Sequence, residues 1–184
     1  MRRRLFRRGR EFPEYAVLEL DANPRAVLTG IRRDIIDMAA HSAHVATALS
    51  CVEILAALYG GALNTGTAAG EAADRVVFSK GHGCMALYAV LARCGFFPRA
   101  WLATYGQNGS PLAQHPMPGV VPGIDFAAGS LGHGLAVAAG WAEALRVRGE
   151  SGRVFTVLGD GECQEGTVWE AAALASVREL GRLV

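Results

Sequence analysis

An acidic residue between two glycines is the feature of this sequence best suited to chemistry. Asp160 lies between Gly159 and Gly161, directly after the apolar run at 154–158. α/β sheets bind ligands at the carboxyl ends of their strands, and glycines there allow a charged group to approach the backbone. A carboxylate in that place offers the hard oxygen that Mg²⁺ prefers. The segment is therefore typical of a site that holds a diphosphate through a metal ion.

A second candidate anion site is the run of small residues Gly129-Ser130-Leu131-Gly132-His133-Gly134, which opens a helix predicted to extend to Arg148. The first N–H groups of a helix lack partners within it, and the helix dipole is positive at that end. A phosphate could bind there. The alternative is a glycine-rich turn that only lets the helix pack closely.

Three histidines are candidates for moving protons. His82 lies between two glycines directly after a strand predicted at 75–79, where an imidazole could donate to a phosphate or a reacting oxygen. Taken alone, His82 could also be an ordinary turn histidine in water, and His44 and His115 are ambiguous. His41 and His44 have helical spacing, but no further ligands follow at regular spacing, so zinc is not favoured.

The elements that must position these residues alternate along the chain. Strands are predicted at 75–79 and 154–158, and helices at 24–41, 84–94, 134–148 and about 167–180. Ser50 to Glu53 has the form of a capping box at a further helix start. The segment 98–128 lacks periodicity and holds five prolines, which is typical of a functional loop. The alternation predicts an α/β protein: a three-layer parallel sheet with helices on both faces.

Composition restricts the class of protein. The 184 residues carry a net charge of +1, and six of the 18 basic side chains lie in the first ten residues. We therefore divide the chain into an Arg-rich arm at 1–20 and one domain at 21–184. The arm could contact nucleic acid, an acidic partner or a membrane surface, but a solvated tail is favoured over these. No stretch of 18 apolar residues is evident, so no membrane span is expected. Four scattered cysteines indicate reduced thiols and a cytoplasmic protein.

Several segments in sequence order together resemble one family. They are Ser42-Ala43-His44, Leu49-Ser50, Ser79-Lys80-Gly81-His82, Gln114-His115-Pro116, Gly129 to Gly134, and Gly159-Asp160-Gly161-Glu162 with Gln164-Glu165-Gly166. The chain, from about Asn23 to Val184, resembles the thiamine diphosphate-binding domain of transketolases. The likeness is closest to the N-terminal subunit of the split, two-gene form.

The resemblance implies thiamine diphosphate and Mg²⁺ as cofactors. Asp160 would bind the metal, and His82 would lie near the diphosphate and the reacting centre. The remaining cofactor-binding set implied is Gly129, Ser130, Leu131, Gly132, Gly159, Gly161 and Glu162. The reaction implied is transfer of a two-carbon ketol unit from a ketose, such as a sugar phosphate, to an aldose.

The resemblance also assigns roles to the other candidates. His44 and His115 would surround the substrate carbonyl and hydroxyls, where groups with a pKa near the operating pH suit proton transfer. Glu165 would lie at a subunit interface and relay between active sites.

Partners are implied in the same way. The family's metal motif extends to an Asn on the next strand, and a separate pyrimidine-binding domain carries the glutamate that activates the cofactor. This sequence reaches Val184 without either. We therefore expect a fold incomplete at its C-terminus and a hetero-oligomer with a chain that supplies the Asn and with a C-terminal transketolase subunit. Alone, the chain is expected to bind cofactor weakly and to be inactive. The alternatives are a non-catalytic interaction protein or truncated relic, and a thiamine diphosphate enzyme acting on 2-oxo acids.

Overall fold

The structure is a computed structural model, and it describes residues 17–20, 23–41, 44–64 and 73–184. Most of the predicted arm at 1–20 lies outside the described residues. The strands are β1 (Arg75–Phe78) and β2 (Val154–Val157). The helices are α1 (Pro24–Met38), α2 (Val45–Leu49), α3 (Val52–Ala57), α4 (Cys84–Arg93), α5 (His133–Arg148) and α6 (Gly166–Val177). Short helical turns are η1 (Ala39–His41), η2 (Leu58–Ala62), η3 (Gly81–Gly83), η4 (Arg99–Thr104) and η5 (Gly161–Gln164).

The sheet is parallel, as the alternation of elements predicts. β1 pairs with β2 so that Arg75 lies beside Val154 and Phe78 beside Val157. A further parallel bridge joins Val154 to Leu183 on the other side of β2. The Val184 N–H donates to the Val154 carbonyl at 2.9 Å, and the Thr156 N–H donates to the Val184 carbonyl at 2.8 Å. β2 therefore lies between β1 and the last residues of the chain.

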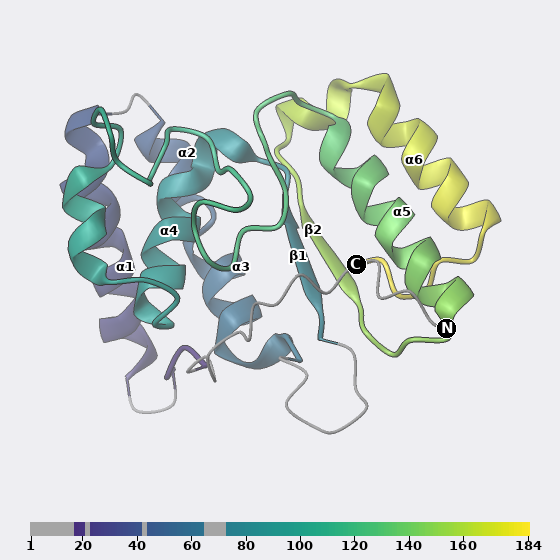
Figure 1. Cartoon of the computed structure of the whole chain (residues 1–184), viewed down its shortest axis with the longest axis horizontal. Coiled ribbons are helices and arrows are strands. Elements are labelled where there is room, and N and C mark those ends of the chain that lie inside the picture. The colour runs from purple at the N-terminus through teal and green to yellow at the C-terminus, as the bar shows by residue number, and fades with distance from the viewer. Residues whose placement is uncertain (1–16, 21–22, 42–43, 65–72) are drawn as a thin grey trace.

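Helices cover both faces of this sheet, which confirms the predicted three-layer arrangement. α5 and α6 lie on one side and α1 to α4 on the other (Figure 1). Side chains alternate between the two faces of a strand. Accordingly, Val77 packs in a small cluster with alanines of α5, whereas its neighbour Phe78 packs in the large core with α1, α3 and α4. The alanines Ala138, Ala139 and Ala142 allow α5 to lie close to the sheet.

One charged side chain lies in the large core. Ile31, Ile35 and Met38 lie at helical spacing and form the apolar stripe of α1, but Asp34, which falls largely on the other side of that spacing, is also buried. Its carboxylate accepts from Arg93 Nε at 2.7 Å and also pairs with Arg99. A buried carboxylate requires such partners, and these two tie α1 to α4 and η4.

The predicted capping box is wrong. Ser50 has helical backbone angles and closes α2, so Cys51 occupies the position before α3. Ser50 Oγ donates to the Thr47 carbonyl at 2.8 Å, and Glu53 pairs with Arg32 of α1. Two short helices that follow each other almost without a break leave Ser50 no free N–H group to cap.

The segment Val45–Ala62 is apolar and long enough to cross a membrane by length and composition, with a mean hydropathy of 1.6 over 18 residues. The expectation from sequence is that no such stretch exists. In the structure the segment is divided into α2, α3 and η2, and Gly61 within η2 has φ of 151°. Ala48, Val52 and Leu55 are buried in the large core. The apolar residues therefore serve packing within the domain.

A buried carboxylate also fixes the start of β1. Asp74 accepts from the Arg153 N–H at 2.7 Å, from Arg153 Nη2 at 2.6 Å and from the Asn64 N–H at 2.9 Å. Burial would raise the pKa of Asp74, but the Arg153 side chain and the two backbone donors lower it below its ordinary value. This contact joins the beginnings of β1 and β2.

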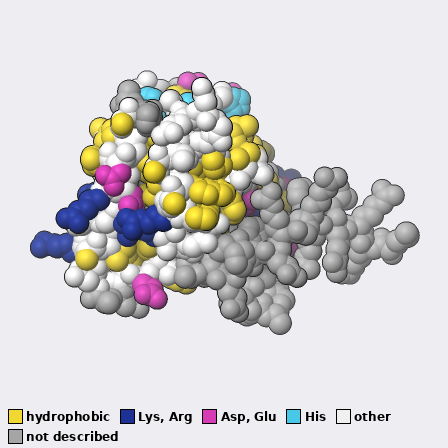
Figure 2. Space-filling view, turned by 60° about the vertical axis from the view of Figure 1, so that its left-hand side comes forward, with side chains coloured by type: hydrophobic (Ala, Val, Ile, Leu, Met, Phe, Trp, Pro, Cys, Tyr) yellow, Lys and Arg dark blue, Asp and Glu magenta, His cyan; other side chains and the backbone are white. Residues whose placement is uncertain are grey.

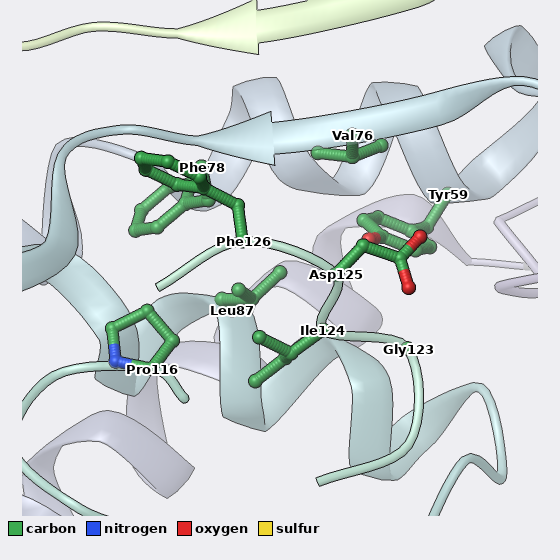
Figure 3. Close-up of a pocket in the computed structure, with 9 residues that line it drawn as sticks. All are labelled: Tyr59, Val76, Phe78, Leu87, Pro116, Gly123, Ile124, Asp125 and Phe126. Atoms are coloured by element: carbon green, nitrogen blue, oxygen red, sulfur yellow. The ribbon is translucent and has the colours of Figure 1, made fainter. Parts of the chain in front are cut away.

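The proline-rich segment 98–128 contains η4 and otherwise no regular element, as its sequence predicts. Leu112, Val121 and Ile124 are buried and hold it on the domain. Figure 3 shows Pro116, Ile124 and Phe126 of this segment facing β1 and α4. These residues help to line a cavity of about 10 Å³. That volume accommodates about one water molecule, so this cavity is no substrate site.

Candidate active site

The candidate site forms where the carboxyl ends of β1 and β2 meet the first turn of α5. Ser79 follows β1, Gly159 follows β2 at a distance of two residues, and Gly132 precedes α5. A Cβ at Gly134 would lie 2.2 Å from Ser79 Oγ. Only glycine permits this approach of helix to strand. Three segments far apart in sequence are thus in contact at one edge of the sheet.

The carboxylate of Glu162 lies at the centre of this junction and is 2% exposed. Its Oε1 accepts from the Ser79 hydroxyl and from the Gly132 N–H at 2.9 Å, and its Oε2 accepts from the Gly159 N–H at 3.1 Å. Ser79 Oγ in turn accepts from the Gly134 N–H at 3.2 Å. Glu162 is expected from the sequence to bind cofactor, but every hydrogen bond that the structure gives it is internal.

This network changes the expectation for the first turn of α5. Backbone N–H groups at a helix N-terminus attract anions. The N–H groups of Gly132 and Gly134 already donate to Glu162 and Ser79, so a side-chain carboxylate occupies part of the predicted phosphate site. Gly129, Ser130 and Leu131 precede this turn and are exposed. Gly129 has φ of 153°, which favours glycine.

The three candidate histidines lie in neighbouring segments of the structure. From the sequence, this grouping is expected only through the family resemblance. The rings of His44 and His82 are 5.4 Å apart and meet edge to face. A Cβ at Gly129 would lie 3.5 Å from the His115 ring, and one at Gly81 would lie 2.8 Å from Ala128. The turn of His82 and the loop of His115 are therefore in contact. Figure 2 shows histidine side chains at the top of one face of the molecule.

The electrostatics of this cluster favour a neutral His82. Burial lowers its pKa, and the positive charges possible on His44, on Lys80 and on His115 lower it further, whereas Glu162 raises it. The net direction is down from the ordinary value. A neutral imidazole can accept a proton at one ring nitrogen while the other ring N–H donates a hydrogen bond, which suits a general base.

Lys80 also belongs to the site, although it is not among the predicted site residues. Its ammonium donates to Ser50 Oγ at 3.0 Å, and its side chain lies along Gly159, where a Cβ would be 3.5 Å from Lys80 Cγ. Its aliphatic chain thus passes beside the residue that directly precedes the predicted metal ligand. Its position between Ser79 and Gly81, after an apolar strand, is the signal that could have identified it.

Asp160 lies at the end of β2, as predicted, and its side chain is exposed. No described residue donates to its carboxylate, and a Cβ at Gly161 would meet nothing within 4 Å. The described residues hold no group of three or more His, Cys, Asp or Glu side chains that could bind a metal alone. One carboxylate with phosphate oxygens and water is nevertheless a usual Mg²⁺ environment. Asp160 with Lys80 and His82 therefore fits a magnesium diphosphate.

Glu165 and Thr167 join the site to α6. Glu165 is exposed and directly precedes α6. A Cβ at Gly132 would lie 2.8 Å from Glu165 Cβ, and Thr167 Oγ1 donates to the Gly132 carbonyl at 3.0 Å. Gly132 has φ of 84°, so glycine is favoured there on two grounds. Sequence reasoning did not identify Ser79 or Thr167, because nothing in their neighbourhoods shows which segments they meet.

The parallel sheet with helices on both faces and glycines at its strand ends is the arrangement expected of a thiamine diphosphate-binding domain. The family model described as "Transketolase, thiamine diphosphate binding domain" matches residues 25–184. The chain belongs to this family, as the resemblance predicted.

Two relatives and one solved structure show the extent of the similarity. The chain is 40% identical over 159 residues to one subunit of the apulose-4-phosphate transketolase of Actinobacillus succinogenes, covering 84% of this chain and 58% of the relative. It is 42% identical to one subunit of a 6-deoxy-6-sulfo-D-fructose transketolase of a Clostridium species, covering 77% and 52%. The chain thus spans about half the length of these relatives. Transketolase from Leishmania mexicana superposes with a TM-score of 0.75 at 30% identity, over 86% of this chain and 26% of that one.

Proposed function

We propose that this chain is the cofactor-binding part of a heteromeric transketolase that transfers a two-carbon ketol unit from a ketose to an aldose. The observation that carries the proposal is the meeting of Asp160, Lys80 and the histidine cluster at one edge of the sheet. The family match supports the reaction class. The names of two relatives, each called a subunit of a transketolase, support a partner chain.

Each residue at this edge has a distinct task in the proposal. Asp160 binds Mg²⁺, and Lys80 offsets the negative charge of the diphosphate. When bound, thiamine diphosphate supplies the electron sink for breaking a carbon–carbon bond. His82, held neutral by its surroundings, exchanges a proton with an oxygen at the reacting centre. His44 and His115 bind and orient the sugar hydroxyls beside it.

The surface of α6 supports association with another chain. Glu170 is the only charged residue in this helix, and just Val168 and Ala171 are buried. Val177 is 81% exposed, Trp169 66% and Leu174 55%. A helix that is apolar all round is usually covered. We propose a cytoplasmic hetero-oligomer in which a C-terminal subunit completes the active site, and in which the chain alone is inactive.

Calorimetric titration with thiamine diphosphate and Mg²⁺ tests the proposal on the chain co-purified with its partner subunit. Asp160→Asn is expected to weaken cofactor binding at least about 100-fold, since a lost charged ligand costs several kcal/mol. Asp37→Asn, which changes an exposed carboxylate on α1, serves as the matched control. Ketol transfer is then assayed with apulose 4-phosphate and 6-deoxy-6-sulfo-D-fructose as donors.

The outcomes separate the candidate functions. Cofactor binding lost only in Asp160→Asn, together with ketol transfer, supports the proposal. A stable complex that binds no thiamine diphosphate would instead indicate a non-catalytic interaction protein. Turnover of 2-oxo acids without turnover of sugars would place the chain with another class of thiamine enzyme.

A further inference from the structure

The hydrogen bonds of Glu162 connect it to three residues, two of which are distant in sequence. Ser79 lies 83 residues from Glu162, and Gly132 lies 30 residues from it. Gly159 is the residue just before the candidate metal ligand. One carboxylate thus joins the ends of β1 and β2 to the first turn of α5.

Every hydrogen-bond partner that the structure gives this carboxylate is a donor. Its two oxygens accept from one hydroxyl and two backbone N–H groups, which matches the acceptor-only character of an ionised carboxylate. The nearby ammonium of Lys80 donates to Ser50 instead. Burying a charge in this way is costly, and backbone donors are what compensates for it. Such a network specifies a unique arrangement only when all its members are satisfied.

We propose that Glu162 is a positioning residue and not a cofactor ligand: its buried carboxylate fixes the turns at Gly132 and Gly159 relative to each other. The consequence for the cofactor rests on the proposed function. If Gly132 and Asp160 flank a diphosphate, Glu162 sets the width of the gap between them while contacting neither the diphosphate nor the metal.

Glu162→Gln tests the geometry with almost no change in shape. An amide has one oxygen, so in either orientation its NH₂ group faces a backbone N–H group, either that of Gly159 or that of Gly132. Amide hydrogen exchange of the chain is expected to accelerate about tenfold or more at one of these two glycines. Glu162→Ala should accelerate both. Ser79→Ala, which removes one hydroxyl, should accelerate Gly134 and provides a milder variant should the Glu162 variants not fold.

Asp34→Asn is the matched control, because it disturbs a buried carboxylate of the large core that pairs with Arg93 and takes no part in the Glu162 network. Glu162→Gln and Asp34→Asn are each measured at a temperature the same number of degrees below their own melting temperature, so that the two variants are compared at similar stability. In the co-purified complex, only Glu162→Gln should raise the dissociation constant for magnesium thiamine diphosphate, by about tenfold. Unchanged exchange at Gly132, Gly134 and Gly159, equal acceleration there by Asp34→Asn, or unchanged cofactor affinity would each overturn the inference. Amide hydrogen exchange needs no cofactor. It therefore tests the positioning role of Glu162 even if the wild-type complex binds no cofactor and the proposed function fails.

Discussion

Two glycines of α5 offer a test of how tightly this helix meets β1. Alanine at Gly134 would place its Cβ 2.2 Å from Ser79 Oγ and 2.3 Å from Ser79 Cβ, distances that force Ser79 to move. Alanine at Gly140, in the same helix, would meet nothing within 4 Å. The same substitution should therefore have opposite effects at the two positions.

The magnitudes follow from three terms. Replacing glycine by alanine within a helix gains about 0.5–1 kcal/mol. At Gly134 this gain is opposed by about 1–3 kcal/mol of overpacking. Displacing Ser79 also costs about 1–3 kcal/mol, because it removes a hydrogen bond to the buried Glu162 carboxylate. Gly134→Ala should lose about 1–5 kcal/mol, and Gly140→Ala should gain about 0.5–1 kcal/mol.

Thermal unfolding followed by circular dichroism measures both variants. A chain of this size shifts its melting temperature by about 2–4 °C for each kcal/mol. Gly140→Ala is thus expected to melt a few degrees above wild type, and Gly134→Ala clearly below it. If Gly134→Ala were as stable as Gly140→Ala, the contact between α5 and the end of β1 would be looser than described, and the network around Glu162 would lose its basis.

Three further predictions concern pH and surface. Burial raises the pKa of Asp74, but the Arg153 side chain and the two backbone donors together lower it below its ordinary value. The stability advantage of wild type over Asp74→Asn should therefore be present above about pH 4 and disappear as the pH falls through the lowered value. Urea unfolding between pH 2 and 6 measures this difference, and a difference that stays constant would refute the prediction. Because burial and neighbouring positive groups lower the pKa of His82, wild type should lose stability relative to His82→Gln as the pH falls below about 6.5, and an NMR titration midpoint at or above that value would contradict this. Val177→Asp should weaken association with the partner subunit, measured by light scattering, and should leave the melting temperature nearly unchanged. Val147→Asp, at a similarly exposed position on α5, should change neither the association nor the melting temperature.

The regular elements could be predicted from the sequence because their signals are local. Apolar runs mark β1 and β2, and apolar residues at helical spacing mark the helix predicted at 24–41. Asp160 could be placed at the ligand edge because the ends of parallel strands share that edge. These predictions require only the neighbouring residues.

The parts that escaped prediction depend on partners distant in sequence. Asp34 looks like an outward charge on α1 until Arg93 and Arg99, 59 and 65 residues away, neutralise it in the core. Two carboxylates of one motif have opposite fates, since η5 turns Glu162 inward and leaves Asp160 exposed. Alternation of residue types cannot distinguish these directions within a single helical turn. The roles of the histidines, of Glu165 and of the Gly129–Gly132 segment stay predictions.

The hydrogen bond from Thr167 to the Gly132 carbonyl connects α6 to the candidate cofactor site, so the position of α6 can affect the free energy of cofactor binding. The helix whose apolar surface is proposed to contact another chain is linked through its first turn to Gly132, at the edge of the candidate cofactor site. A partner that steadies α6 also steadies Gly132, so occupancy of one surface and of the other are thermodynamically linked. Such coupling is reciprocal: the factor by which a partner tightens coenzyme binding equals the factor by which coenzyme tightens the assembly.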